Sequence, residues 1–454
     1  MGKLIIGCDA DGVLTDLSSF NIREGKKYFK KEPVNKNAYS SKDMFGVSSK
    51  QNFMFGLKVY TKYCTKELPR ENAKEVIQKL NEEKCELHEI TARMFTTNKG
   101  LIGNIYRKLF EKWCKKHSMN FKSFEYCSED YSPRDKLIAC KKLNVDVMVE
   151  DKPDVALYLA ENNTKVILFD APYNKELKHK NIVRVTNWLE VYEKVQEIKS
   201  QLNSNDKFTK LEIEDKLKLS DEEKKQYFKN YHNYLKNLEI NENALKKGNR
   251  RFKLIYKLAY LPIKIRFNPK VIGKENVPYQ DGFIVASNHL NSFDQYIIGY
   301  ALGNRAMTGF AASTIENTFR GKLFNYTKSA VFIDRTDKES KKNGEEEISK
   351  RIIHGQTALI FPEGTRKNKD DEGKQQQQLP FKFGTVSIAQ KTGTGIIPIS
   401  LYYGKKKYVK IGQIQFINPE DDLIKANEKL ENTILNMTLK SMEEDKVKKK
   451  ILKK

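Results

Sequence analysis

Short runs of β-branched and aromatic residues alternate with helical patterns through the first 200 residues of the chain. Between the runs, apolar residues recur at intervals of three and four, which is the spacing of one face of an α-helix. This alternation is typical of a parallel β-sheet flanked by helices. The runs that we expect to form strands are Leu4 to Cys8, Glu86 to Thr91, Phe121 to Tyr126, Val145 to Val149 and Lys165 to Phe169.

Residues 18–69 break this rhythm directly after the first expected strand and are rich in Lys, Phe and Tyr. They follow the carboxyl end of that strand, and open α/β sheets bind their ligands at this edge. We therefore expect a first domain over residues 1–198, with a cap inserted at about 18–69.

The second half of the chain begins with a strongly charged segment that has almost no Gly or Pro, and we interpret residues 199–249 as a charged helical linker. A second pattern of strands and helices starts near Val271 and predicts a further α/β domain over residues 250–430. Its expected strands are Phe283 to Ser287, Ala330 to Ile333, Thr357 to Phe361 and Gly395 to Leu401. We expect residues 431–454 to form a basic C-terminal tail.

Chemically suggestive residues recur where the strands of the first domain end. Asp-Ala-Asp-Gly at residues 9–12 places two carboxylates after a buried strand, which is unfavourable unless they hold a cation or do chemistry. Ile-Thr-Ala-Arg at residues 90–93 offers a hydroxyl and a guanidinium that suit a phosphate. Lys136 follows on an expected helix, and Glu-Asp-Lys-Pro-Asp at residues 150–154 ends the next strand.

In this order, the four elements resemble the haloacid dehalogenase-like phosphohydrolases, especially the small 5′-nucleotidase branch with its Asp-x-Asp-Gly-Val-Leu opening. The resemblance covers residues 1 to about 195. It implies that Asp9 is a nucleophile that forms an aspartyl-phosphate and that Asp11 is the general acid and base. It also implies that Thr91 and Lys136 hold the phosphoryl oxygens.

The same resemblance implies a magnesium ion bound among Asp9, the Asp11 main-chain carbonyl and the acidic pair Glu150-Asp151. The nucleotidase branch usually has two aspartates where this chain has Glu150 and Asp151. We favour Asp151 as the metal ligand, and which acidic residue of 150–154 binds the metal stays open. Whether this domain is an active phosphatase or a non-catalytic module that binds a phosphorylated metabolite also stays open.

A second set of motifs lies in the C-terminal half. His289 and Asp294 follow the strand expected at 283–287, close enough for the carboxylate to orient the imidazole if a helix begins there. Val-Phe-Ile-Asp-Arg ends at Arg335, Phe-Pro-Glu-Gly-Thr-Arg occupies 361–366, and Ile-Pro-Ile at 397–399 ends another strand.

This ordered set closely resembles the glycerophospholipid acyltransferases, of which the lysophosphatidic acid acyltransferases are the best-known members, over about residues 250–420. The resemblance implies transfer of an acyl group from acyl-coenzyme A or acyl carrier protein to 1-acyl-glycerol-3-phosphate, giving phosphatidic acid. His289 would be the base and Asp294 its orienting group. The residues that it implies for binding the acceptor phosphate are Arg335, Glu363, Gly364, Thr365 and Arg366.

The two resemblances make the expected fold class α/β: an N-terminal Rossmann-like parallel sheet with an inserted cap, a charged linker and a C-terminal α/β acyltransferase domain. The formal net charge of +24 favours polyanionic partners. No stretch approaches the ~20 apolar residues that cross a bilayer. Basic and apolar residues mix at 250–261, so we expect a cytoplasmic enzyme held peripherally on the inner, anionic face of the membrane. Burial of this segment against its own domain is the alternative.

Two other readings of the whole chain stay open. The second domain could bind lipid without catalysis and accompany an active nucleotidase. Nucleic-acid binding would also use a basic surface, but no aromatic-interleaved recognition motif or zinc knuckle is evident, and we expect no nucleic-acid partner.

Overall fold

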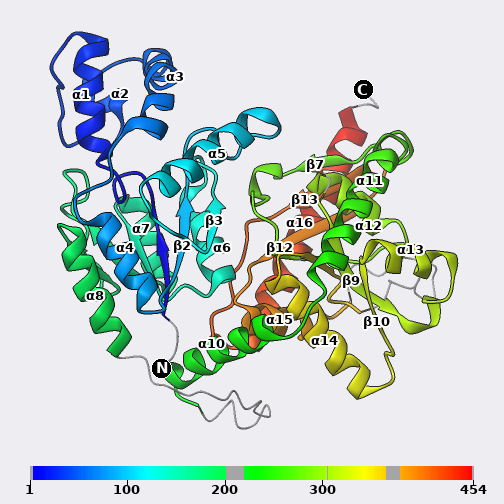
Figure 1. The fold of residues 1–454 in the computed structure, drawn as a ribbon. Helices are drawn as coiled ribbons and strands as arrows, with labels where there is room; N and C mark the ends of the chain where they lie inside the picture. Colours follow the sequence, from blue (N-terminus) through cyan, green and yellow to red (C-terminus); the bar gives the residue numbers. More distant parts are fainter. Residues whose placement is uncertain (1–3, 201–218, 304, 365–378, 452–454) are drawn as a thin grey trace. The chain divides into compact units, whose positions relative to one another are not determined.

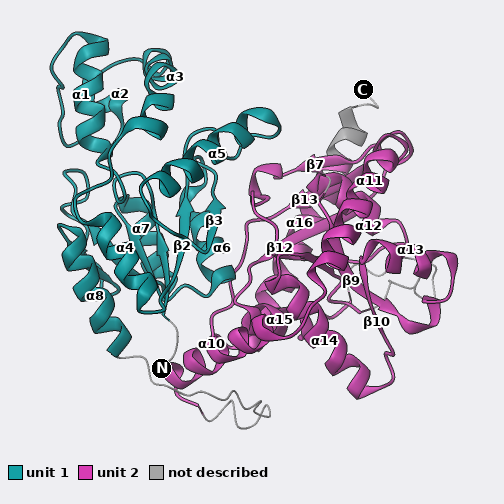
Figure 2. Ribbon diagram, in the orientation of Figure 1, with its two compact units in different colours: residues 1–207 teal, residues 208–454 magenta. Residues whose placement is uncertain are grey.

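The computed structural model describes residues 4–200, 219–303, 305–364 and 379–451 (Figure 1). The chain divides into two compact units, residues 1–207 and residues 208–454 (Figure 2). Each unit contains one β-sheet flanked by helices, so the expected α/β fold class is confirmed.

The first unit is built on a six-stranded, fully parallel sheet with strand order β3-β2-β1-β4-β5-β6. The strands are β1 (Ile5–Cys8), β2 (Glu86–Thr91), β3 (Ser123–Tyr126), β4 (Val147–Glu150), β5 (Lys165–Phe169) and β6 (Ile182–Val185). The five expected strands are all present, and only the half-exposed edge strand β6 is additional. Because β2, β1 and β4 are neighbours, the motifs that follow these strands meet at one edge of the sheet, beside the point where the strand order reverses.

Helices cover the first sheet and extend it at its carboxyl edge. Those that alternate with the strands are α4 (Ala73–Glu82), α5 (Leu101–Lys116), α6 (Ser132–Leu143), α7 (Pro153–Glu161) and α8 (Trp188–Ser200). The segment that we expected as a cap forms α1 (Leu17–Phe29), α2 (Ser41–Phe45) and α3 (Ser49–Lys66), which stand above the carboxyl end of β1 in Figure 1. Helix α3 begins with a capping box between Ser48 and Gln51, which satisfies its first free amides.

The second unit has a seven-stranded sheet with order β10-β9-β11-β8-β12-β13-β7, in which only the β12–β13 pair is antiparallel. The strands are β7 (Lys270–Ile272), β8 (Ile284–Ser287), β9 (Met307–Ala312), β10 (Ala330–Ile333), β11 (Thr357–Ile360), β12 (Ile396–Tyr403) and β13 (Lys407–Ile411). The four expected strands are β8, β10, β11 and β12. Strand β8 lies between β11 and β12, so the loop after β8 is flanked by the ends of both neighbours.

The helices of the second unit include two regions that differ from the sequence-based prediction. They are α10 (Asp221–Asn237), α11 (Glu242–Phe267), α12 (Asp294–Leu302), α13 (Phe319–Thr327), α14 (Lys338–Ile353), α15 (Gly384–Thr392) and α16 (Leu423–Ile451). We expected residues 199–249 to be a charged helical linker, of which residues 201–218 lie outside the described residues. The described part is helical, but α10 buries Tyr231 and Leu235 against Ile353 of α14. A stripe of aromatic and leucine side chains, hidden among Lys and Glu, attaches this helix to the second unit.

The expected basic tail, residues 431–454, is also different in the structure. Helix α16 continues to Ile451, and Ile434, Thr438, Ser441 and Asp445 lie buried along one of its faces at helical spacing, while residues 452–454 lie outside the described residues. Its lysines obscure this face in the sequence. Across the described ranges, none of the helices has both the length and the apolar character needed to cross a bilayer.

Two candidate active sites

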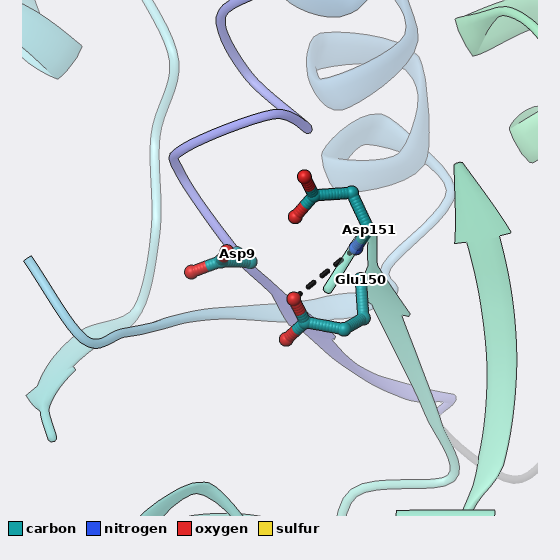
Figure 3. A group of neighbouring side chains, drawn as sticks. All are labelled: Asp9, Glu150 and Asp151. Carbon is teal, nitrogen blue, oxygen red and sulfur yellow. Dashed lines mark hydrogen bonds between the residues drawn. The ribbon is translucent and has the colours of Figure 1, made fainter. Parts of the chain in front are cut away.

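Three buried carboxylates meet at the carboxyl edge of the first sheet (Figure 3). Asp9 follows β1, and Glu150 and Asp151 stand at the end of the neighbouring strand β4. One carboxylate oxygen from each residue lies within 4.8 Å of the others. The strand pairing brings residues 141 and 142 positions apart in the sequence into one acidic cluster, as the motifs predict.

Lys136 of α6 supplies a buried cation to this cluster. Its Nζ atom lies 2.8 Å from Asp9 Oδ1 and 2.7 Å from Glu150 Oε2. Burial opposes a charged lysine, but Asp9 and Glu150 outweigh it and raise the pKa of Lys136 well above its usual value. The second oxygen of Glu150 accepts the backbone N–H groups of Asp151 and Lys152, each at 3.1 Å. Both Glu150 oxygens are therefore engaged by the protein itself.

Asp151 is better suited than Glu150 to hold a cation. Its Oδ2 accepts a short hydrogen bond from the Tyr173 hydroxyl, and within residues 4–200 its buried Oδ1 has no hydrogen-bond partner. Burial and the nearby carboxylates of Glu150 and Asp9 raise the pKa of Asp151 well above its ordinary value. A hard divalent cation would relieve this crowding, since it prefers carboxylate oxygens. The donor set therefore fits magnesium.

Asp11 and Thr91 complete this candidate site. Asp11 Oδ1 lies 3.0 Å from the guanidinium of Arg93, so Arg93 pairs with a carboxylate rather than standing free for phosphate. Burial raises the pKa of Asp11, and Arg93 opposes that rise. The Thr91 hydroxyl is buried and makes no hydrogen bond within the described first unit. Tyr63 of the cap lies beside Arg93, whose guanidinium carbon is 5.0 Å from the centre of the tyrosine ring.

A second candidate site lies after β8 in the other unit. His289 Nδ1 lies 2.7 Å from Asp294 Oδ2, as the sequence spacing predicts. Asp294 is the first residue of α12 and is fully buried, where the N-terminal end of the helix favours a negative charge. The backbone N–H groups of Leu290 and Asn291 donate to the same oxygen at 2.6 Å and 2.9 Å. The Tyr403 hydroxyl donates to Oδ1 at 2.7 Å.

The strands on both sides hold this loop. After β11, the ring of Phe361 stacks on the His289 imidazole. At the end of β12, the side-chain amide of the fully buried Asn288 donates to Leu401 O at 2.9 Å and accepts from Leu401 N at 2.8 Å. Neither contact can be read from sequence spacing, because each joins residues of different strands.

The residues predicted to bind the acceptor phosphate follow two different strands and differ in burial. Glu363 is buried just after β11, and Gly364 follows it with a φ of +72°. A Cβ atom on Gly364 would come 2.8 Å from Nζ of Lys382, a cation that the sequence analysis did not identify. Arg335 is exposed after β10, three strands from β8, or about 14 Å at ~4.8 Å per strand. Thr365 and Arg366 lie outside the described residues.

Two family models match different parts of the chain. Residues 3–201 match the model described as 5′ nucleotidase, deoxy (Pyrimidine), cytosolic type C protein. Residues 268–402 match the model described as Acyltransferase. Each match contains one of the two candidate sites.

Curated relatives and solved structures also resemble the chain. A 1-acyl-sn-glycerol-3-phosphate acyltransferase of Borreliella burgdorferi is 26% identical over 188 residues, which cover 39% of this chain and 72% of that protein. A nucleotidase of Clostridium acetobutylicum is 27% identical over 203 residues, which cover 42% of this chain and 93% of that protein. The crystal structure of the 1-acyl-sn-glycerophosphate acyltransferase from Thermotoga maritima is 19% identical, with a TM-score of 0.33, and the match covers 48% of this chain and 95% of that one.

Proposed function

The chain joins a 5′ nucleotidase-family segment to an acyltransferase-family segment, and we propose that it is a bifunctional enzyme of phospholipid metabolism. The second unit transfers a fatty acyl group from acyl-coenzyme A or acyl carrier protein to 1-acyl-glycerol-3-phosphate and produces phosphatidic acid. The first unit hydrolyses a phosphate monoester. The observation that carries the main activity is the buried His289–Asp294 pair within the matched acyltransferase segment.

The geometry of this pair supports general-base catalysis. An ionised carboxylate only accepts hydrogen bonds, so His289 Nδ1 keeps its proton and donates it in a hydrogen bond to Asp294, which leaves Nε2 with a lone pair. Nε2 removes the proton of the acceptor hydroxyl as its oxygen attacks the thioester carbonyl. The carbon–sulfur bond then breaks, and the thiolate takes the proton back from His289. No covalent acyl-enzyme is needed.

Binding of the acceptor phosphate is assigned to the loops that follow β10 and β11. We propose Arg335 and the turn of Glu363, Gly364, Thr365 and Arg366 as its ligands. The exposure of Arg335 and the position of the Lys382 ammonium beside Gly364 support this placement, because both put a cation at these loops.

The acyl transfer is tested by incubating the purified chain with lysophosphatidic acid and either acyl donor, and measuring phosphatidic acid. His289→Ala should reduce the rate on the order of a thousandfold, because the base is lost. His354→Ala, which removes a histidine on the far end of α14, is the matched control and should keep the wild-type rate. Equal rates in wild type and His289→Ala would contradict the assignment.

The first unit is proposed to act through Asp9. A carboxylate oxygen of Asp9 attacks the phosphorus, and the leaving alkoxide takes a proton from Asp11. Asp11 then removes a proton from the water that hydrolyses the aspartyl-phosphate. Lys136, already 2.8 Å from Asp9, offsets the charge of the phosphoryl group, and the unpaired hydroxyl of Thr91 is available to donate to it.

Magnesium is the cofactor that we propose for this unit, held by Asp9, Asp151 and the Asp11 main-chain carbonyl, with Glu150 as the alternative ligand. When bound, it would screen the negative charges of nucleophile and phosphate. Phosphate release should disappear in Asp9→Asn and persist in Asp154→Asn, whose exposed side chain pairs with Lys152 outside the cluster. Phosphate release by Asp9→Asn at the wild-type rate would contradict the proposal. If the folded wild type released no phosphate, the first unit would instead be a non-catalytic module that binds a phosphorylated metabolite.

We also propose that the chain binds peripherally to an anionic membrane surface on the cytoplasmic side. Helix α11 exposes Leu254, Leu258, Leu261 and Ile265 along one face, with relative exposures of 61%, 72%, 60% and 75%. Its opposite side buries Tyr256 and Ile263 against the domain. Exposed Lys and Arg alternate with the apolar row, a pattern that suits the interface of an anionic bilayer.

Vesicle flotation tests this proposal. The wild type should float with phosphatidylglycerol vesicles and much less with phosphatidylcholine vesicles. Leu258→Ser combined with Ile265→Ser should abolish flotation, whereas Val183→Ser, an exposed apolar position on β6, should not change it. Flotation that survives the double substitution would exclude α11 as the binding surface.

A further inference from the structure

We infer that Tyr403 is a positioning residue of the acyl-transfer site, which fixes the Asp294 carboxylate and through it His289. The inference rests on the proposed acyltransferase function. Tyr403 is the last residue of β12, and its hydroxyl lies 2.7 Å from Asp294 Oδ1. None of the motifs that identify His289 and Asp294 contains this tyrosine.

The two oxygens of Asp294 have different partners. Oδ2 receives the His289 ring and the backbone N–H groups of Leu290 and Asn291, while Oδ1 receives the Tyr403 hydroxyl. A carboxylate held at one oxygen can still turn about its Cβ–Cγ bond. Held at both, it presents Oδ2 to His289 in one orientation.

The Tyr403 hydroxyl is a stable donor in this position. Burial, followed by the nearby charge of Asp294, raises the pKa of Tyr403 well above its usual value, so the phenol keeps its proton at any working pH. Asp294 itself is fully buried, so solvent does not replace a lost donor easily.

Strand β12 contacts both ends of the loop of residues 288–294, which contains His289. Two residues before Tyr403, the backbone of Leu401 forms a pair of hydrogen bonds with the side chain of Asn288. Asn288 directly precedes His289, and Asp294 ends the same loop. The end of β12 therefore fixes the residue before the base and the carboxylate after it, which leaves the imidazole little freedom to move.

Tyr403→Phe removes the donor and keeps the ring. We expect kcat of acyl transfer to fall about 10- to 100-fold, the factor that a hydrogen bond to a charged group represents. KM for lysophosphatidic acid should stay within about twofold, because the proposed phosphate ligands follow other strands. Because the buried Asp294 Oδ1 is left without its donor, the melting temperature should also fall by several degrees, so kcat is measured well below both unfolding transitions. Tyr402→Phe is the matched control, since that ring lies against Tyr408 instead, and it should change none of these values.

A readout that does not need activity separates this inference from the proposed function. The proton between His289 Nδ1 and Asp294 should give a low-field 1H NMR resonance, assigned by its absence in His289→Ala. It should shift in Tyr403→Phe and stay in place in Tyr402→Phe. If Tyr403→Phe shifts this resonance although the wild type transfers no acyl group, the positioning role is supported and the proposed function is refuted. An unshifted resonance, or a wild-type kcat in Tyr403→Phe measured well below both unfolding transitions, would overturn the inference.

Discussion

The ring of Phe361 lies on the imidazole of His289, with ring centroids 4.0 Å apart and planes inclined by 14°. Asp294 fixes the imidazole at its edge, through Nδ1, and Phe361 covers one face. The base is thereby restrained in two directions by residues of two different loops.

Phe361→Ala should lower kcat of acyl transfer about two- to tenfold, because an aromatic pair contributes ~0.5–1.5 kcal/mol. Phe361→Tyr keeps a stacked ring and should retain most of the rate. The comparison needs only steady-state kinetics at one pH. A rate in Phe361→Ala equal to that of the wild type would mean that the stacking has no part in holding His289.

Gly12→Ala should disable the first site. Gly12 has a φ of +87°, and a Cβ atom there would lie 1.9 Å from Asp151 Oδ2, so the proposed metal ligand must move. Since displacement of a reacting group by about 1 Å can reduce a rate about a hundredfold, we expect a loss of that size in phosphate release. Calorimetry with magnesium should show weaker binding, and acyl transfer should be unchanged.

Gly100→Ala is the control for Gly12→Ala. Gly100 lies in the same unit, and its φ of +80° also strains the backbone of an alanine, but a Cβ atom there meets nothing within 4 Å. Normal phosphate release in Gly12→Ala, or an equal loss in Gly100→Ala, would refute the role given to the close contact with Asp151.

Glu89→Gln should stabilise the first unit, increasingly so as the pH rises. Glu89 is fully buried on β2, and neither carboxylate oxygen has a hydrogen-bond partner among the described residues. Burial, reinforced by Asp9, raises the pKa of Glu89 well above its usual value. The folded state thus holds a proton that the unfolded state releases near pH 4.3, so stability falls as the pH rises from there through the folded pKa.

Thermal unfolding at pH 5 and pH 8 measures this effect. Glutamine is neutral at both, so Glu89→Gln should raise the melting temperature by a few degrees at pH 8, at about 2–4 °C per kcal/mol, and by less at pH 5. Glu82→Gln, on the exposed side of α4, should change neither value. A lower melting temperature for Glu89→Gln at pH 8 would mean that the folded protein stabilises the ionised Glu89 carboxylate.

Leu235→Ala tests whether α10 belongs to the second unit. The side chain is fully buried against α14, so its truncation should destabilise that unit by roughly 2–5 kcal/mol. The unfolding transition of the second unit should shift while phosphate release remains. If the segment were a solvated linker, Leu235→Ala would behave like Leu189→Ala, which truncates an exposed leucine of α8.

The sequence predicts the parts of the fold that depend on local pattern. Strands β2 and β5, with the sequences Glu-Leu-His-Glu-Ile-Thr and Lys-Val-Ile-Leu-Phe, each contain two adjacent β-branched residues, and their expected limits agree with the structure to the residue. Strand β9 reads Met-Thr-Gly-Phe-Ala-Ala, which has almost no β-branched residues, and its neighbours in the sheet decide its conformation. The charged sequences of α10 and α16 likewise conceal narrow buried faces that only packing reveals.

The same division applies to the candidate sites. Asp9, Asp11, His289 and Asp294 stand at recognisable spacings, and the structure brings His289 onto Asp294 as predicted. Tyr403 and Asp294 are 109 residues apart and Tyr173 contacts Asp151 from another loop, so these contacts carry no local signal. The sequence identifies the groups that we propose to react, whereas the residues that orient them depend on the order of strands in the sheet.

The most direct test of the account measures phosphatidic acid and free phosphate together for wild type, His289→Ala and Asp9→Asn. Each reaction contains lysophosphatidic acid, an acyl donor, magnesium and a separate soluble phosphate monoester. We predict that His289→Ala loses phosphatidic acid formation and keeps phosphate release, and that Asp9→Asn does the reverse. If wild-type protein, folded and supplied with anionic vesicles, formed no phosphatidic acid with either donor, or formed it equally well without His289, the central claim would be wrong.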